Sequence, residues 1–526
     1  MKISIFSENS WLYKESEVGR QQEAYLHTAR NSDVGFQVLG EALQEPAEVT
    51  LKMTWEGQML VEPQYYEMID IGVDENTDVQ WMTTTDYTRC QDFVTKQAPF
   101  RVYDALKPVS DTFICRERLA LFVALPIGRE VKCGDYRGIL SLTIQGEEHL
   151  LAIHCTVYVP IISDLETTKL GMLNFFSYPN IAMQHGVNCY GESYWNLFRA
   201  YSRSQLDMRC THIMLPPPMP VYDTLKQVID FDFTPAIRAG TIALEEGAQY
   251  IVGAPVAVWS EGAQKGYFLA WDRTVPTESL EAYWMLKLYF EKWAMILKEK
   301  HWENRVMQSL ADEPQVHNSA RYRALSCICR RFLPQVPVIE AVETFELGGA
   351  VDIWVPKQDF YEKSRKTFEV MQEKGETIWF YTCAFPAGKI MNRSMDLPLL
   401  VSRYILWLGF KYGLKGFLHW GFNYYEGPNL WDQACCDHKG AKLPAGDAHI
   451  VYPGKDEVWQ SMRYRQQRAG ARDYELLCQL KQLDESLAYR LVETLCQSFR
   501  DYIAQAHLFE SVYIQLLQAL STLSKE

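Results

Sequence analysis

The sequence lacks a hydrophobic run long enough to cross a bilayer, and its first residues lack the apolar core of a secretory leader. The apolar run at 150–162 is interrupted by His154 and Thr156, and the chain turns polar from Ser7 onward. A membrane-spanning helix needs about 20 apolar residues, and a leader core needs about 7–15. We therefore expect no membrane attachment and a cytoplasmic location.

An excess of positive charge is also lacking. The 526 residues include 52 Lys and Arg against 66 Asp and Glu, which gives a formal net charge of −14. Nucleic acids and anionic membrane surfaces are bound mainly through lysine and arginine. The charge balance therefore argues against both kinds of partner.

The 13 cysteines lack a repeated spacing that would indicate a metal site or a disulfide framework. The segment Cys435-Cys436-Asp437-His438 contains metal-binding residue types. Adjacent cysteines rarely reach one zinc ion together, and no second pair lies at a usable spacing. We expect reduced thiols, no metal ion and no cofactor.

The first third of the chain has the pattern of a β-sandwich. Apolar runs at 119–125, 139–144 and 150–159 have strand length and are separated by turn-rich segments. Closely spaced strands without intervening helices are typical of sandwiches, so we predict such a domain over residues 1–163. We interpret the segment 101–108 as a loop between its strands.

The middle of the chain alternates strands with helical segments, which predicts a (β/α)₈ TIM barrel over residues 164–455. A helical segment beyond residue 279 carries Leu280, Trp284, Leu288 and Tyr289 on one predicted face. The unit between the second and third strands is long and is expected to carry an insertion over the barrel mouth at 216–241. The predicted strands are 173–177, 211–215, 250–252, 305–310, 338–341, 351–355, 377–383 and 416–420.

The end of the chain is predicted to be helical. Leucines recur at three- and four-residue steps from Leu476 to Leu491, which is the spacing of one helix face. We expect residues 456–526 to form a helical cap.

Two adjacent acids follow the fourth predicted strand. Active residues of such barrels lie just beyond the carboxyl ends of the strands, where Asp312, Glu313 and Pro314 occur. Neighbouring side chains point to opposite faces within a strand, but beyond the strand end the chain can turn and bring both to the mouth. One carboxyl could then stay neutral and donate a proton while the other stays ionised. Taken alone, the same tripeptide is an ordinary helix start.

Several other predicted strand ends carry aromatic and polar residues, as sugar sites do. An aromatic ring stacks on the apolar face of a sugar while polar neighbours bind its hydroxyls. Core packing is the competing interpretation. It is favoured for Trp379 and Phe380, and His212 and His419 could each be a buried histidine inside the barrel. The candidates for substrate binding at these ends are Asn174, His212, Asp352, Trp354, Tyr381, Trp420 and Asn423.

Over most of its length the chain resembles glycoside hydrolase family 123 and the related domain of unknown function 4091, in which a β-sandwich, a barrel with Asp-Glu after its fourth strand and a helical tail follow in this order. The specific motifs lie between Asp312 and Glu475. Two departures occur: Ala471-Arg472 replaces an acid-bearing run, and His419 stands where tyrosine is common. The motifs that carry the resemblance are 379–383, 416–423, 446–447, 451–454, 461–465 and 468–475.

The resemblance implies a retaining β-N-acetylhexosaminidase, with N-acetylgalactosamine as the preferred sugar and an oligosaccharide or glycoconjugate as substrate. In this mechanism the acetamido oxygen of the substrate attacks the anomeric carbon. Asp312 would orient the acetamido group, and Glu313 would act as acid and then base. Tyr381 would donate to the acetamido oxygen, and Trp420 would form the floor of the sugar subsite. Candidates for hydroxyl contacts are Asn423, Asp432 and Asp447.

Three alternatives stay open at this point. One is a glycosidase on a sugar without an acetamido group, in which Asp352 is recruited as the second carboxylate. Another is a carbohydrate-binding protein that has the fold without turnover. A third is a metal-dependent enzyme in which His212, Asp352 and His419 converge.

Overall fold

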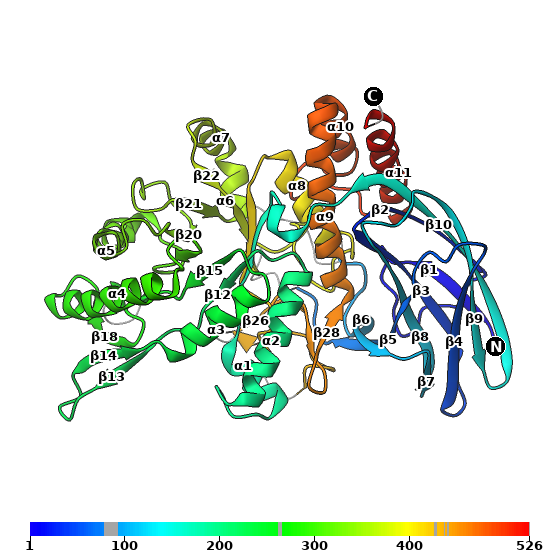
Figure 1. The fold of residues 1–526 in the computed structure, drawn as a ribbon, viewed down its shortest axis with the longest axis horizontal. Helices are drawn as coiled ribbons and strands as arrows, with labels where there is room; N and C mark the ends of the chain where they lie inside the picture. The colour runs from blue at the N-terminus through cyan, green and yellow to red at the C-terminus, as the bar shows by residue number, and fades with distance from the viewer. Residues whose placement is uncertain (78–92, 261–265, 426–428, 436, 439–440, 525–526) are drawn as a thin grey trace. The chain divides into compact units, whose positions relative to one another are not determined.

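The computed structural model describes residues 1–77, 93–260, 266–425, 429–435, 437–438 and 441–524 (Figure 1). The chain folds into two compact units. Unit 1 comprises Met1–Lys169, Cys383–Gly413 and Asn423–Glu526, and unit 2 comprises Leu170–Thr382 and Leu414–Phe422. The division into domains 1–163, 164–455 and 456–526 stays a prediction, and each unit is described by itself below.

Two β-sheets of unit 1 share one hydrophobic core, as the predicted sandwich requires. On β4, Ala47, Val49 and Leu51 are buried and alternate with exposed residues, which gives the sheet one apolar face. Apolar residues from both sheets form one cluster. In one sheet the order is β1 (Ile3–Ser7), β3 (Ser32–Ala42), β8 (Arg118–Ile127), β5 (Gln64–Val73), β6 (Phe100–Val109), β28 (Val458–Ser461) and β27 (Tyr452–Pro453), and in the other it is β2 (Glu23–Arg30), β10 (Glu147–Ile161), β9 (Gly134–Ile144), β4 (Ala47–Trp55) and β7 (Thr112–Cys115).

The prediction of a loop at 101–108 is wrong, because these residues belong to β6. The charged residues that interrupt the apolar pattern each have a partner of opposite charge. Arg101 pairs with Asp70, Lys107 pairs with Glu67, and Asp104 pairs with Arg463, which is 359 positions away. A charged residue with a paired partner is compatible with a packed strand.

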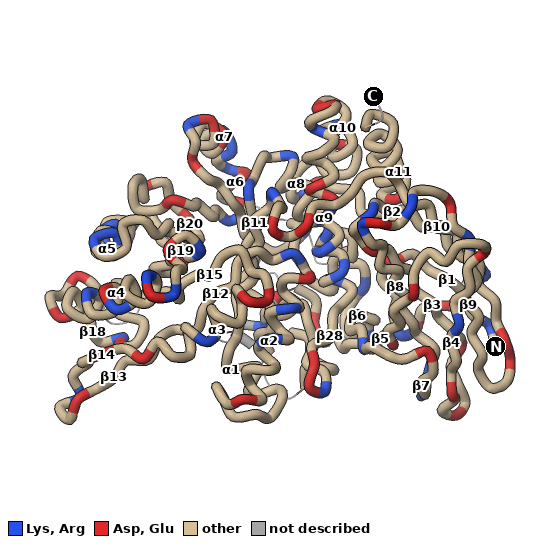
Figure 2. Tube along the Cα trace, in the orientation of Figure 1, with Lys and Arg blue, Asp and Glu red and all other residues tan. Residues whose placement is uncertain are grey.

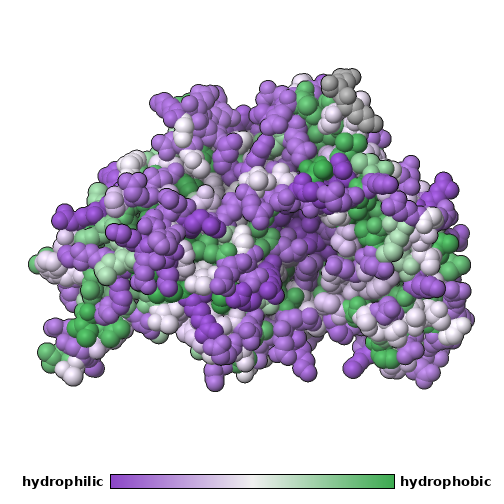
Figure 3. Space-filling view, in the orientation of Figure 1, coloured by the Kyte–Doolittle hydropathy of each residue, from purple (hydrophilic) through white to green (hydrophobic). Residues whose placement is uncertain are grey.

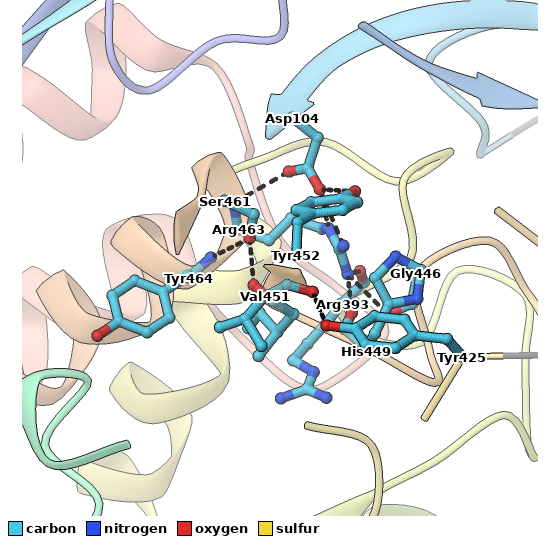
Figure 4. A network of polar contacts seen from close by, with 11 residues as sticks. Asp104, Arg393, Tyr425, Gly446, His449, Val451, Tyr452, Ser461, Arg463 and Tyr464 are labelled. Carbon is cyan, nitrogen blue, oxygen red and sulfur yellow. Dashed lines mark hydrogen bonds and ion pairs between the residues drawn. The ribbon is translucent and has the colours of Figure 1, made fainter. Parts of the chain in front are cut away.

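A fully buried ion pair joins β6 to the start of helix α9 (Met462–Leu483) (Figure 4). Arg463 Nη2 and Nε lie 2.9 and 3.1 Å from Asp104 Oδ2, and the Tyr452 hydroxyl donates to the same oxygen at 2.7 Å. Arg463 Nη1 donates to the carbonyls of Arg393, Gly446 and His449. One guanidinium therefore holds several distant segments of unit 1 together.

The predicted C-terminal helices are present as α9 (Met462–Leu483), α10 (Glu485–Leu495) and α11 (Ala506–Leu523). The Ser461 and Asp484 side chains accept backbone N–H groups at the starts of α9 and α10. Helix α8 (Val401–Lys411) packs on α9, and a Cβ at Gly470 would lie 2.5 Å from the Arg403 carbonyl oxygen. Helix α11 packs on β10 of the sandwich (Figure 1).

Unit 2 contains every one of the eight predicted barrel strands, within a few residues. They are short and buried, as parallel strands covered on both faces are. One sheet has the parallel order β19 (Val306–Gln308), β15 (Tyr250–Gly253), β12 (His212–Met214), β11 (Gly171–Asn174), β24 (Gly416–His419) and β23 (Phe380–Thr382), and another has β20 (Ile339–Val342), β21 (Ile353–Pro356) and β22 (Thr377–Ile378).

Among the described residues, single bridges of Gln308 with Val338 and of Lys357 with Tyr381 join the two parallel sheets. The sheets themselves do not close, so a closed barrel stays a prediction. At the amino ends of the strands, Trp379 packs tightly on Gly171 and Gly416. A Cβ atom would lie 2.2 Å from the Trp379 indole if added at Gly171, and 2.1 Å from it if added at Gly416. The helices between the strands are α1 (Tyr178–His185), α2 (Glu192–Asp207), α3 (Thr234–Glu245), α4 (Leu280–Lys300), α5 (Ser319–Phe332), α6 (Gln358–Lys363) and α7 (Arg365–Glu373).

The segment predicted as an insertion forms a hairpin of β13 (Met219–Tyr222) and β14 (Val228–Asp232), followed by α3. Leu225 between these strands is 77% exposed, and Figure 3 shows hydrophobic surface at this end of unit 2. The predicted apolar face of α4 is wrong in part, because Leu280 and Trp284 are exposed while Leu286 and Phe290 are buried. In the part of the chain that is described, every helix is too short or too polar to span a membrane.

We expect Asp104→Ala to lower the free energy of unfolding by about 3–5 kcal/mol, because it leaves the buried Arg463 guanidinium without its carboxylate. Urea-induced unfolding followed by tryptophan fluorescence measures this change. Glu48→Gln, at an exposed position of β4, is the control and should leave the curve unchanged. Superimposable curves for Asp104→Ala and the control would contradict the role of the pair.

Candidate active site

The two adjacent acids lie just beyond the carboxyl end of β19, as predicted. Residues 309–311 lead from the end of the strand to Asp312 and Glu313. The backbone of Glu313 has φ +44°, in the left-handed region, and Pro314 follows. A residue in this region breaks the up-and-down alternation of a strand. The chain therefore turns at the acids and does not continue as a strand.

The carboxylate of Glu340, on the neighbouring strand β20, holds the segment before these acids. Its Oε2 accepts the backbone N–H groups of Leu310 and Ala311, both at 2.9 Å, and the Tyr322 hydroxyl at 3.0 Å. Its Oε1 accepts the Ser309 hydroxyl at 3.1 Å. Glu340 is buried, and burial raises its pKa to about 8, although the two N–H groups lower it. This side chain positions the turn that carries Asp312 and Glu313.

Glu313 is hydrogen-bonded to one of the predicted substrate-binding residues. The Tyr381 hydroxyl, on β23, donates to Glu313 Oε1. Tyr381 also forms a backbone bridge with Lys357, which directly follows β21. Lys357 in turn pairs with Glu343, which directly follows β20. The ends of neighbouring strands thus bring acids, a lysine and a tyrosine to one edge of the sheets.

Glu313 was expected to be the acid that keeps a proton, but in the structure the pKa of Asp312 is raised. Asp312 is exposed to solvent, yet many protein atoms surround its carboxyl group. The loss of hydration that this crowding causes raises the pKa of Asp312 to about 7, the charges of Glu313 and Glu343 raise it further, and Lys357 lowers it. The site in the free protein therefore holds an aspartic acid that is close to half-protonated at neutral pH.

Three predicted site residues lie at the amino edge of the sheets, opposite to the edge of Asp312. His212 begins β12, lies 2.7 Å from the Thr211 hydroxyl and stacks on Tyr250. Burial lowers the pKa of His212 to about 3, so it is neutral. Asp352, directly before β21, pairs with Arg330, and Trp354 donates its indole N–H to Glu376. The structure does not bring these three to Asp312 and Glu313.

Two other predicted residues lie at the carboxyl edge. Asn174 is the last residue of β11, is fully buried and donates to Cys210 Sγ at 3.2 Å. Trp420 directly follows β24, the strand beside the one that carries Tyr381, and is half-buried. Trp420 therefore lies on the same edge of the sheets as Tyr381.

The candidates for hydroxyl contacts lie in unit 1. Asn423 is fully buried and forms a backbone bridge with His449. Asp447 is fully buried and accepts Asn392 Nδ2 at 2.7 Å. Asp432 is exposed and pairs with Arg101 at 2.6 Å. Their role in binding stays a prediction.

The metal alternative receives no geometric support. Across the described ranges, which leave out Cys436 of the cysteine-rich segment, no group of three or more His, Cys, Asp or Glu residues could hold a metal ion. Asp352 is already engaged by Arg330, and His419 Nδ1 accepts the Gly421 N–H at 3.0 Å.

The sequence analysis missed Glu340, Glu343 and Lys357. A signal for them exists: Glu340 is an acid inside an apolar strand, and the other two follow a strand end within two residues. A buried acid needs hydrogen-bond donors, so its presence in a core strand indicates a structural or catalytic role.

Comparisons with known proteins agree with the motif-based resemblance. Residues 250–480 match the model of the glycoside hydrolase 123 catalytic domain. No curated protein matches. A solved structure of a family 123 glycoside hydrolase from Clostridium perfringens, described in terms of glycolipid glycan hydrolysis, matches with a TM-score of 0.75 and 13% identity, over 99% of this chain and 97% of that one. The predicted resemblance to family 123 is therefore confirmed, and the two chains share a fold.

Other solved structures match weakly. A GH10 xylanase with a bacterial Ig-like domain from termite gut has a TM-score of 0.34 and 12% identity, over 67% of this chain and 90% of that one. A Bacteroides ovatus GH5 xyloglucanase has a TM-score of 0.36 and 8% identity, over 89% of this chain and all of that one. These two similarities are too low to support an argument.

We expect Glu340→Leu to destabilise the protein, because it leaves the buried N–H groups of Leu310 and Ala311 without an acceptor, at about 1–3 kcal/mol each. Glu340→Gln keeps an oxygen for them and should cost less. Thermal unfolding of both variants measures the difference, and equal losses would contradict the positioning role.

The same residue predicts a pH dependence of stability. Because the pKa of Glu340 is raised to about 8 in the folded protein, its stabilisation is fully present below its ordinary pKa of about 4.5 and is lost as the pH rises through 8. The wild type should therefore lose more stability between these pH values than Glu340→Gln. Parallel stability curves for the two proteins would contradict the buried, protonated state.

Proposed function

We propose that this protein is a retaining glycoside hydrolase that removes terminal β-N-acetylhexosamine residues, preferably N-acetylgalactosamine, by substrate-assisted catalysis. The match of residues 250–480 to a catalytic domain of family 123 supports the hydrolase class. One observation carries the finer proposal: Asp312 and Glu313 follow one another beyond β19, and the Tyr381 hydroxyl is bonded to Glu313.

The first step needs an acid and a stabiliser of positive charge. Glu313 protonates the glycosidic oxygen as the acetamido oxygen of the substrate attacks the anomeric carbon, which forms an oxazolinium-like ring and releases the aglycone. The acetamido nitrogen gains positive charge in this step. The ionised Asp312 accepts its N–H and offsets that charge.

The second step returns a proton to Glu313. Glu313, now ionised, removes a proton from water as the water oxygen attacks the anomeric carbon and opens the ring. Two displacements at this carbon retain its configuration. Tyr381 donates to Glu313 in the free protein. In the proposed mechanism it donates to the acetamido oxygen once substrate engages the acid.

The sugar specificity follows from the need for an acetamido group. Aryl β-N-acetylgalactosaminide and its glucosamine counterpart should be hydrolysed, the first faster, whereas aryl β-galactoside should not. Equal turnover of the β-galactoside would favour the alternative glycosidase, and binding without turnover across a glycan panel would favour a carbohydrate-binding protein. A glycolipid glycan is a further substrate to test, because the related Clostridium perfringens enzyme is described with one.

We expect Glu313→Gln to lower kcat/KM on an aryl N-acetyl-β-galactosaminide by about 10²–10⁴-fold, because it removes the proton donor. The loss should be smaller on a substrate whose aglycone is a good leaving group, which needs little protonation. Glu281→Gln, on exposed α4, is the matched control and should behave as wild type. Turnover of the poor-leaving-group substrate within a few-fold of wild type would refute the acid role.

The pKa of Asp312 predicts the acid limb of the pH profile. Because the ionised form is required and the pKa of the free protein is about 7, kcat/KM should rise with pH up to about that value. Asp312→Asn should remove this limb and leave low residual activity. A flat profile between pH 5 and 8 in the wild type would contradict the assigned role.

A further inference from the structure

One ion pair beside the proposed acids is not used by the proposed chemistry. Lys357 directly follows β21, Glu343 directly follows β20, and their side chains are paired. Figure 2 shows acidic and basic residues close together around the labels β19 and β20. Only 8% of the Lys357 side chain is exposed, and a lysine is rarely buried unless it is paired. Because a buried charge is screened little by water and salt, this pair acts strongly on its neighbours.

Both members of the pair are fixed to the segments that carry the proposed site. Glu343 Oε2 accepts Gln315 Nε2 at 2.9 Å, and the Glu343 N–H donates at 3.2 Å to the carbonyl of the proline before that glutamine. Lys357 forms a backbone bridge with Tyr381, whose hydroxyl donates to Glu313. The pair is therefore held against the segment that follows the two acids and against the strand of the tyrosine.

Ionisable groups from several elements act on the Asp312 carboxyl. The charges of Glu313 and Glu343 raise its pKa, and the charge of Lys357 lowers it. Lys357 is the cation of this group. Its members are Glu313 beside Asp312, Tyr267 on β17 (Gly266–Leu269), Glu340 on β20, Glu343 after β20, Lys357 after β21, and Tyr381 on β23, which is bonded to Glu313.

Substrate binding makes a positive charge near Asp312 necessary. A sugar that covers the acids displaces water from this carboxyl, and the loss of hydration favours its neutral form. The proposed mechanism needs the ionised form, which accepts the acetamido N–H. A fixed ammonium nearby stabilises the ionised form, and its own burial keeps this effect from being screened.

We propose that Lys357 is a positioning residue of the proposed reaction, whose ammonium, held in place by Glu343, keeps Asp312 ionised while the sugar covers it. The inference rests on the proposed function and adds the pair that sets its lower pH limit. The two charges of the pair act in opposite directions on Asp312. Neither residue has to touch the substrate, since both act through that carboxylate.

The pH profile of kcat/KM tests the inference, with an aryl N-acetyl-β-galactosaminide whose aglycone is a good leaving group. Such an aglycone needs little protonation, so the acid limb reports the ionisation of Asp312. Lys357→Met removes a positive charge and should move the midpoint of this limb up by about 0.5–1 pH unit, which lowers kcat/KM about 3–10-fold on the acid side. Glu343→Gln removes a negative charge and should move the midpoint down by a similar amount.

Further variants separate the charge from a structural role. Lys357→Arg keeps the positive charge and should keep the midpoint of the wild type. Lys363→Met, at an exposed position of α6, is the matched control and should leave the profile unchanged. The loss in Lys357→Met should shrink as the pH rises, which a misfolded site would not show. Glu343→Gln keeps an acceptor for Gln315, and it tests the inference even if Lys357→Met does not fold.

The outcomes distinguish the inference from the proposed function. A midpoint that stays in place, or moves in the other direction, in Glu343→Gln or in a folded Lys357→Met would overturn the role of the pair. If Asp312→Asn still removes the limb in that case, the proposed function stands without the pair. Absence of turnover in the wild type, or a limb that persists in Asp312→Asn, would contradict the proposed function itself.

Discussion

A single buried glutamic acid side chain determines where the acids of unit 2 can act. Glu340 accepts two consecutive backbone N–H groups beyond the end of β19, and so it fixes the path of the chain directly before Asp312. Both N–H groups lie beyond the end of β19, directly before the chain turns, and therefore need an acceptor other than a neighbouring strand. The chemistry assigned to Asp312 and Glu313 depends on that turn, and therefore on an acid that touches neither reacting group.

Most of the fold follows from local sequence patterns. The parallel strands of unit 2 are short apolar runs between breaks, and such runs are recognisable without knowledge of their neighbours. The strand at 101–108 was missed because its charges are neutralised by residues distant in sequence, above all Arg463. The face of α4 was also assigned incorrectly, because periodicity shows that a helix has an apolar stripe but not which of two stripes is covered.

The candidate site residues could be predicted only as accurately as the ends of the strands could be predicted. Asp312, Glu313 and Tyr381 were proposed because each lies near the carboxyl end of a predicted strand, and the structure joins the last two by a hydrogen bond. His212 and Trp354 were proposed as polar or aromatic residues at the ends of predicted strands, yet they lie toward the amino ends of their strands. For strands of three or four residues, an error of two positions in a predicted boundary moves a side chain from one edge of the sheet to the other.

The left-handed backbone of Glu313 restricts which residues evolution or a designer can place there. Branching at Cβ is disfavoured at such dihedral angles, whereas Asn, Asp and Gly tolerate them. Replacement by valine or threonine would therefore disturb the loop itself, and the resulting defect would say little about proton transfer. Homologues without hydrolase activity are accordingly expected to have asparagine, aspartate or glycine at this position, because the backbone conformation limits the substitutions that the loop tolerates.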